Sequence, residues 1–259
     1  MYYLLSTVIL GLVEGITEFL PISSTGHLIL VNRWFSFGEP FTSLFDIVIQ
    51  SGAILAVIVL FWKDIWPTSW KFSELKNKWG AILAAFIPTA IIGLALGKVA
   101  EKYLFNPTVV AAALIFYGVV FLILERGKSR GQKEVVSYRD ALVIGLVQAL
   151  ALVPGTSRSG ATIIGLLLLG YARPVAARFS FLLAIPTLLA AGGYSLLKYR
   201  APISTSEIGF LIIGFLISFI SAYLASRWFM AYISRKNFIH FAWYRIILGL
   251  VVMISVFWG

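Results

Sequence analysis

Long runs of apolar residues, separated by short polar segments, make up most of this 259-residue chain. Six runs are long enough for a helix of about 20 residues, the length that crosses the hydrocarbon core of a bilayer. They lie near Phe45–Trp62, Trp79–Gly97, Thr108–Leu124, Phe179–Leu197, Ile208–Ser226 and Phe241–Trp258. The pattern predicts an all-α integral membrane protein with six transmembrane helices in a single membrane domain, residues 1–259.

Two further apolar stretches are interrupted by a proline and a polar string. One is broken at Pro21 and continues to residue 35, and the other is broken at Pro154 and continues to residue 170. Each half is too short for a comfortable span, and non-helical backbone at membrane depth is tolerated only where protein or a water-filled cavity surrounds it. We therefore expect two re-entrant helix–loop–helix hairpins, over residues 2–35 and 141–170.

The two interrupted stretches resemble each other, and a second pair of similar segments lies later in the chain. The pairs are Gly11–Glu14 with Gly145–Gln148, and Ile87–Ala90 with Ile185–Leu188. They predict an inverted-topology repeat with halves 1–124 and 140–259, because such repeats bring broken helices together near the bilayer midplane. We expect Ser23–His27 and Gly155–Thr162 to line one shared polar pocket.

Basic residues predict which way the chain faces. With two re-entrant hairpins, the loops at 63–78, 125–139, 173–178 and 227–240 share a side and hold fourteen Lys and Arg residues, against five on the opposite side. Cytoplasmic loops carry the excess of Lys and Arg. The first side is therefore predicted to be cytoplasmic and both termini external.

Composition excludes several classes of protein. The chain is 60% hydrophobic and 12% charged, whereas soluble domains carry about 25% charge, so a soluble enzyme and a disordered chain are both excluded. The net charge of +10 fits basic loops beside anionic lipid. We expect no nucleic-acid partner, because basic and aromatic residues are not interleaved outside the apolar runs.

Two glutamates in the first hairpin are candidate metal ligands. Glu14 and Glu18 are four residues apart and therefore share a helix face. Like charges at membrane depth repel, so either one is protonated or both face a cation. Mg²⁺ or Ca²⁺ would suit these oxygen ligands. The alternative is a pair of helix-end glutamates near the interface. His27, beyond the break, is either part of the site or a hydrogen-bonded packing histidine.

The string Pro154–Thr162 is typical of an anion clamp. Its glycines free backbone N–H groups, the following helix offers its positive end, and the Arg158 guanidinium matches phosphate oxygens. The hydroxyl groups beside it belong to Ser157, Ser159 and Thr162. The alternatives are a structural ion pair between Arg158 and Glu14 or Glu18, or a helix break without a ligand. Spacing alone indicates an anionic ligand and leaves the reaction open.

Four segments resemble one known family. The segments Glu14–His27, Phe45–Gln50, Pro154–Thr162 and Ala177–Leu183 are similar to motifs of the bacterial undecaprenyl-diphosphate phosphatase (bacitracin-resistance) family. The resemblance implies hydrolysis of undecaprenyl diphosphate to undecaprenyl phosphate and inorganic phosphate, which recycles the lipid carrier for cell-wall synthesis and has bacitracin resistance as a consequence. It also implies the bacterial plasma membrane, a site facing the periplasmic or outer side and a divalent cation, and leaves room for a homodimer.

Residues and resemblance together suggest a mechanism. Arg158 would hold the diphosphate, helped by hydroxyl groups of both hairpins: Ser23, Thr25, Ser157, Ser159 and Thr162. Glu14 and Glu18 would bind the metal, or one would act as a base. We favour Ser24 as the nucleophile, activated by His27 or Glu18; a phosphorylated His27 or direct attack by water is the alternative.

A transporter or flippase of a phosphorylated polyprenyl lipid would also need broken helices and an anion clamp. Transport needs no acid, base and nucleophile beside that clamp, so the residues Glu18, Ser24 and His27 favour an enzyme.

Overall fold

The computed structural model describes residues 1–67, 69, 71–126 and 131–258, and every regular element in this part is helical apart from one β-bridge between Lys133 and Tyr171. The long helices are α3 (Phe41–Leu60), α5 (Phe72–Leu104), α6 (Pro107–Arg126), α9 (Arg173–Lys198), α10 (Thr205–Ile233) and α11 (Ile239–Trp258). The shorter ones are α1 (Tyr2–Thr17), α2 (Ser24–Val31), α4 (Trp62–Ile65), α7 (Tyr138–Gln148), the 3₁₀-helix η1 (Ala149–Leu152) and α8 (Arg158–Leu168).

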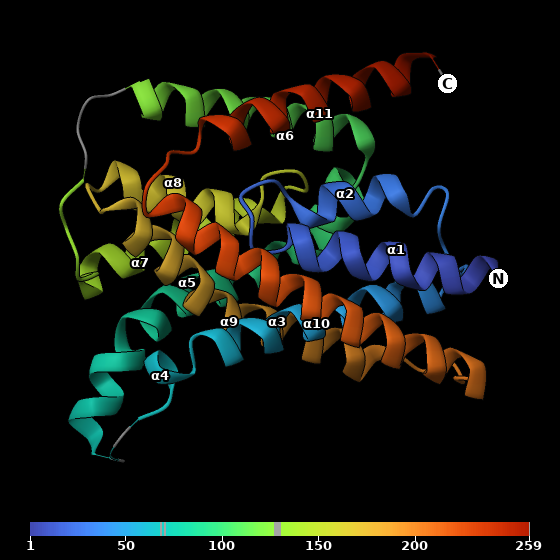
Figure 1. Ribbon diagram of the computed structural model, residues 1–259, viewed down its shortest axis with the longest axis horizontal. Helices are drawn as coiled ribbons and strands as arrows, with labels where there is room; N and C mark the ends of the chain where they lie inside the picture. Colours follow the sequence, from blue (N-terminus) through green and yellow to red (C-terminus); the bar gives the residue numbers. More distant parts are fainter. Residues whose placement is uncertain (68, 70, 127–130, 259) are drawn as a thin grey trace.

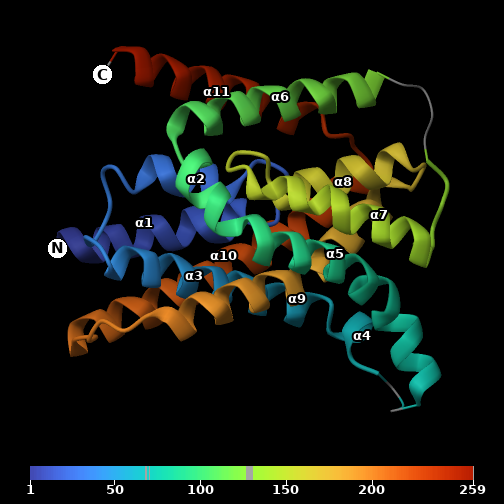
Figure 2. The same ribbon diagram turned by 180° about the vertical axis from the view of Figure 1, so that it is seen from behind.

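Six helices among the described residues are long and apolar enough to cross a membrane. They correspond one to one with the six predicted apolar runs, so the prediction of a multi-pass helical protein is confirmed. The long helices run roughly along the long axis of the molecule, and both chain ends lie at the same end of the bundle (Figure 1). Helices α6 and α11 form an antiparallel pair along one side (Figure 2).

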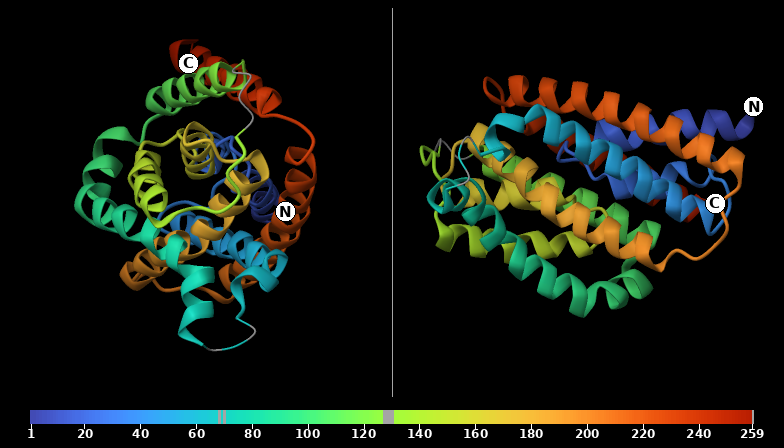
Figure 3. Two further views of the ribbon diagram at one scale, coloured as in Figure 1. Left: turned by 90° about the vertical axis from the view of Figure 1, so that its left-hand side faces the viewer. Right: turned by 90° about the horizontal axis from the view of Figure 1, so that it is seen from below.

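The two interrupted segments are surrounded by the long helices (Figure 3, left). Each segment doubles back, and a tyrosine hydroxyl ties its two ends together. Tyr2 donates a hydrogen bond to the Trp34 carbonyl at 2.8 Å, and Tyr171 donates to Asp140 Oδ2 at 2.6 Å. The pair α1 and α2 therefore begins and ends near the chain termini, whereas α7 and α8 begin and end at the opposite end of the bundle (Figure 1).

The loops within these two segments have the same local geometry. Ser23 (φ 72°) and Ser157 (φ 69°) both have positive φ angles, and both precede a helix. Each side chain accepts a hydrogen bond from the amide of the glycine three residues later, at 3.3 Å from Gly26 and 3.1 Å from Gly160. These caps replace an intrahelical partner that the first turn lacks.

Ser157 follows Ser23 at the same distance along the chain as Gly145–Gln148 follows Gly11–Glu14. Packing follows the same scheme, because α1 packs on α10 and α7 packs on α5. The two Ile-Pro-Thr segments do not follow it. They lie on α5 and α9. Helix α9 is the first long helix after its interrupted segment, whereas α5 is the second, so the two helices are not equivalent in the two halves.

Close helix contacts position both segments. A Cβ atom on Gly15 would lie 2.0 Å from Ser221 Oγ on α10, and one on Gly145 would lie 2.1 Å from the Ala85 carbonyl on α5. Small residues of this kind let two backbones approach each other in helical membrane proteins. Glycine is therefore required where α1 and α7 meet their long partners.

Candidate active site

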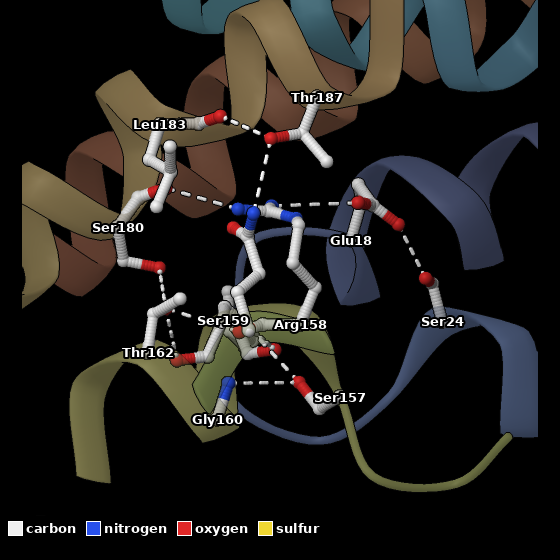
Figure 4. Close-up of polar contacts among 12 residues, drawn as sticks. Glu18, Ser24, Ser157, Arg158, Ser159, Gly160, Thr162, Ser180, Leu183 and Thr187 are labelled. Atoms are coloured by element: carbon white, nitrogen blue, oxygen red, sulfur yellow. Dashed lines mark hydrogen bonds and ion pairs between the residues drawn. The ribbon is translucent and has the colours of Figure 1, made fainter. Parts of the chain in front are cut away.

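Glu18, Ser24 and Arg158 form the centre of the site (Figure 4). Ser24 Oγ donates a hydrogen bond to one oxygen of Glu18, and Arg158 Nη2 lies 3.4 Å from the other oxygen. Arg158 Nη1 donates to the Ser180 carbonyl at 2.9 Å. The side chains of Arg158 and Glu18 are 9% and 4% exposed. One buried carboxylate thus contacts both the hydroxyl and the guanidinium.

Two helices begin at this centre. Ser24 opens α2 and Arg158 opens α8, so both residues lie where unpaired backbone N–H groups and the positive end of the helix dipole favour an anion. Ser159 Oγ donates to the Leu20 carbonyl at 2.9 Å and so links the two loops directly.

Arg245 on α11 also holds the two loops together, and sequence analysis missed it. This fully buried side chain donates to the carbonyls of Pro21 (2.9 Å), Gly155 (2.8 Å) and Thr156 (2.9 Å). Positive φ angles at non-glycine residues are costly and persist only where the surroundings enforce them, and Arg245 contributes that enforcement. The signal was an arginine inside an apolar span, which by itself marks a functional position.

Glu14 lies beside this centre with few partners. The residue is 1% exposed, and neither carboxylate oxygen accepts a hydrogen bond from a donor in the described part of the chain. A divalent cation would satisfy these oxygens. The described residues contain no cluster of three or more His, Cys, Asp or Glu side chains suited to a metal.

His27 has hydrogen bonds at both ring nitrogens. Nδ1 lies 2.7 Å from the Ser23 carbonyl and Nε2 lies 2.7 Å from the Tyr244 hydroxyl. Because a carbonyl only accepts, Nδ1 carries the proton and Nε2 accepts from the tyrosine. This arrangement is the one expected of a hydrogen-bonded packing histidine that supports the Ser23 turn.

A cavity of about 660 Å³ opens beside the Glu18–Arg158 pair. Six predicted site residues line it: Glu18, Ser23, Ser24, Thr25, Ser157 and Arg158. It continues between α5 and α9 along apolar side chains such as Phe86, Leu94 and Leu188, and reaches Lys98, Glu101 and Lys198 near the ends of those helices.

Comparison with known proteins identifies the family. The family model described as bacitracin resistance protein BacA matches residues 7–251. The chain belongs to this family. Relatives named undecaprenyl-diphosphatase include proteins from Acidovorax ebreus (48% identical, covering 99% of this chain and 96% of the relative) and Polaromonas sp. strain JS666 (46%, with the same coverage). The relative of that name from Enterococcus faecalis is 42% identical and covers 97% of this chain and 96% of its own length.

Four predicted site residues of this BacA-family protein lie outside the cavity lining: Glu14, His27, Ser159 and Thr162. Ser159 binds Leu20 as described, and Thr162 Oγ1 lies 2.6 Å from Ser180 Oγ. These two hydroxyls therefore hold α8 against the first loop and α9. Gln148, Thr89 and Thr187 line the cavity but were not predicted as site residues. They lie in the segments Gly145–Gln148, Ile87–Ala90 and Ile185–Leu188, which the sequence analysis recognised only as sequence similarities.

Proposed function

We propose that this BacA-family protein is an undecaprenyl-diphosphatase, which hydrolyses undecaprenyl diphosphate to undecaprenyl phosphate and inorganic phosphate. The observation that carries the proposal is the Ser24–Glu18–Arg158 arrangement at the polar end of a cavity with apolar walls. The relatives' name agrees with it. The diphosphate enters the polar end, and the first part of the polyprenyl chain lies between α5 and α9.

Ser24 is the nucleophile in this proposal. As its Oγ–P bond forms, the bridging P–O bond breaks, undecaprenyl phosphate leaves, and the Ser24 proton passes to Glu18. Water then hydrolyses the phosphoserine, releasing inorganic phosphate and returning the proton to Ser24. Arg158 and the first turns of α2 and α8 stabilise the negative charge that develops on the phosphoryl oxygens. The Ser24–Glu18 hydrogen bond supports these roles.

A divalent cation, Mg²⁺ or Ca²⁺, would be held by Glu14 and Glu18. The unpartnered oxygens of Glu14 fit such a cation, and Mg²⁺ commonly takes one or two carboxylates together with substrate phosphates and water. Bound there, it would neutralise part of the diphosphate charge. His27 and Arg245 have positioning roles, because they hold the two loops without lining the cavity.

We further propose that α1–α2 and α7–α8 are re-entrant hairpins of an inverted repeat, with the cavity opening to the periplasmic or outer face of the plasma membrane. The matching Ser23 and Ser157 turns support the repeat. The lysines at the far end of the cavity lie on the side that the loop charges predict to be external. The homodimer that the family resemblance allows is tested by the mass of the protein in detergent.

The test is release of inorganic phosphate from undecaprenyl diphosphate by purified protein in detergent, with and without a metal chelator. We expect release that the chelator abolishes and added Mg²⁺ or Ca²⁺ restores, and none from Arg158→Ala. Release unaffected by the chelator would remove the cation from the proposal. No release by the metal-loaded protein, together with movement of labelled lipid across vesicles, would favour the flippase.

A further inference from the structure

Three polar side chains form a cluster on the cavity wall that the catalytic proposal does not use. Gln148 Nε2 lies 3.0 Å from Thr89 Oγ1 and 3.2 Å from Thr187 Oγ1. Gln148 ends α7 and is 1% exposed, and the two threonines come from the Ile-Pro-Thr segments of α5 and α9. All three line the same cavity as Glu18 and Arg158.

The threonines determine which way the Gln148 amide faces. Thr187 donates its proton to the Leu183 carbonyl at 2.7 Å, and Thr89 donates to the Gly145 carbonyl at 2.7 Å. A hydroxyl has one proton, so toward Gln148 both oxygens can only accept. The amide nitrogen must therefore face the threonines. Gln148 Oε1 is left buried, with no hydrogen-bond donor among the described residues.

Arg158 has the opposite deficiency. Its two terminal nitrogens are engaged by Ser180 and Glu18, but Nε is buried without an acceptor in the described part of the chain. Buried polar groups without partners are costly and rare in folded proteins. Here one residue lacks an acceptor and the other a donor, and both line one cavity. A single ligand that both accepts and donates would satisfy the two groups together.

We propose that Gln148 and Arg158 bind the terminal phosphate in a form that carries a proton. One phosphate oxygen accepts from Arg158 Nε–H, and the P–OH group donates to Gln148 Oε1. Because both atoms are buried, the anion reaches them through a shift of the Arg158 side chain, whose contact with Glu18 is long at 3.4 Å. The inference rests on the proposed function for the identity of the phosphate, which belongs to the diphosphate substrate or to the released product.

This pairing has a specific consequence for anion selectivity. At mildly alkaline pH, inorganic phosphate and sulfate are both tetrahedral dianions, but only phosphate carries an O–H group. An acceptor whose orientation is fixed forms a hydrogen bond with that O–H group. Sulfate has no proton to donate and leaves the acceptor unpaired. The site should therefore bind phosphate at least about tenfold more tightly than sulfate, a difference of about 1.4 kcal/mol.

The experiment measures binding of radiolabelled inorganic phosphate to the purified full-length protein in detergent, and its displacement by sulfate at constant ionic strength. We expect Gln148→Met to lose about tenfold in phosphate affinity with sulfate affinity unchanged. Gln148→Glu keeps an acceptor and should keep the preference for phosphate. Gln50→Met replaces another glutamine of the cavity lining and should leave the ratio unchanged.

A second, independent test frees the Gln148 amide from its two threonine partners. In the double variant Thr89→Val, Thr187→Val, the Gln148 amide is free to turn its N–H groups toward the anion, so sulfate affinity should rise and the phosphate preference should shrink.

Equal affinity of the unaltered protein for phosphate and sulfate would overturn the inference. So would equal loss of both anions in Gln148→Met while the double variant leaves the ratio unchanged. Hydrolysis of undecaprenyl diphosphate is scored separately: an active enzyme without anion preference refutes this inference alone, and a selective protein without hydrolysis refutes the proposed function alone.

Discussion

At the scale of single residues, the site depends on one carboxylate that serves two partners. Glu18 accepts from Ser24 and faces Arg158, so the proposed proton transfer from the serine has its acceptor already in contact. The roles proposed for these three residues rest on their contacts and on the cavity beside them. The sequence motifs identified candidate residues but did not show which hydroxyl group contacts which carboxylate.

Replacing Ser24 by alanine should reduce phosphate release from undecaprenyl diphosphate by on the order of 10³ or more, because the proposed nucleophile is removed. The measurement is turnover by purified protein. Ser43→Ala is the matched control, since Ser43 is exposed and its hydroxyl donates to Glu39. Turnover by Ser24→Ala close to that of the unaltered protein would transfer the nucleophile's role to water or to His27.

Replacing Arg245 by methionine should destabilise the protein by about 3 kcal/mol or more, because three buried carbonyl groups lose their donor. Thermal unfolding in detergent measures the effect, and phosphate release should fall with it because the two loops lose their common support. The control is Arg227→Met, at an exposed position on α10. An unchanged unfolding temperature would show that the loops hold their shape without Arg245.

At the scale of elements, hydrophobic pattern located the helices better than it located their ends. The run predicted near Trp79–Gly97 lies within α5, which extends from Phe72 to Leu104. The run indicates where apolar side chains meet lipid, whereas the helix continues into the polar interface as long as backbone hydrogen bonds can form. Proline did not end α5 or α9, since Pro88 and Pro186 lie inside them.

A methyl group on Gly145 should destabilise the contact between α7 and α5. The added Cβ would lie 2.1 Å from the Ala85 carbonyl, a backbone atom that cannot move alone. We expect Gly145→Ala to lower the unfolding temperature in detergent and to weaken phosphate release. Gly193→Ala on α9 is the control, because nothing lies within 4 Å of its added Cβ. Equal behaviour of both variants would mean that the close approach is dispensable.

At the scale of the whole molecule, two segments that turn back from opposite ends bring their loops together among the long helices (Figure 3). The chain contains no cysteine, so single cysteines can report which side of the membrane each loop occupies.

Membrane-impermeant maleimide should label Glu39→Cys and Ser206→Cys in intact cells, and Glu134→Cys and Lys236→Cys only after permeabilisation. All four positions are exposed. The prediction follows from three spans between residues 39 and 134, and one span plus a re-entrant hairpin between 134 and 206. Labelling of residues 134 and 206 from the same side would mean that the second interrupted segment crosses the membrane completely.

The sequence by itself determined the class of protein, the number of apolar helices and six of the residues that line the cavity. These properties depend on local pattern: an apolar run of sufficient length must lie in lipid, and Glu18, Ser24 and Arg158 stand within recognisable strings. Only the tertiary structure decided how distant positions meet. Arg245 binds Pro21 and Gly155, and Gln148 is held between Thr89 and Thr187. Such contacts arise from helix packing, so no spacing along the chain specifies which donor will face which acceptor.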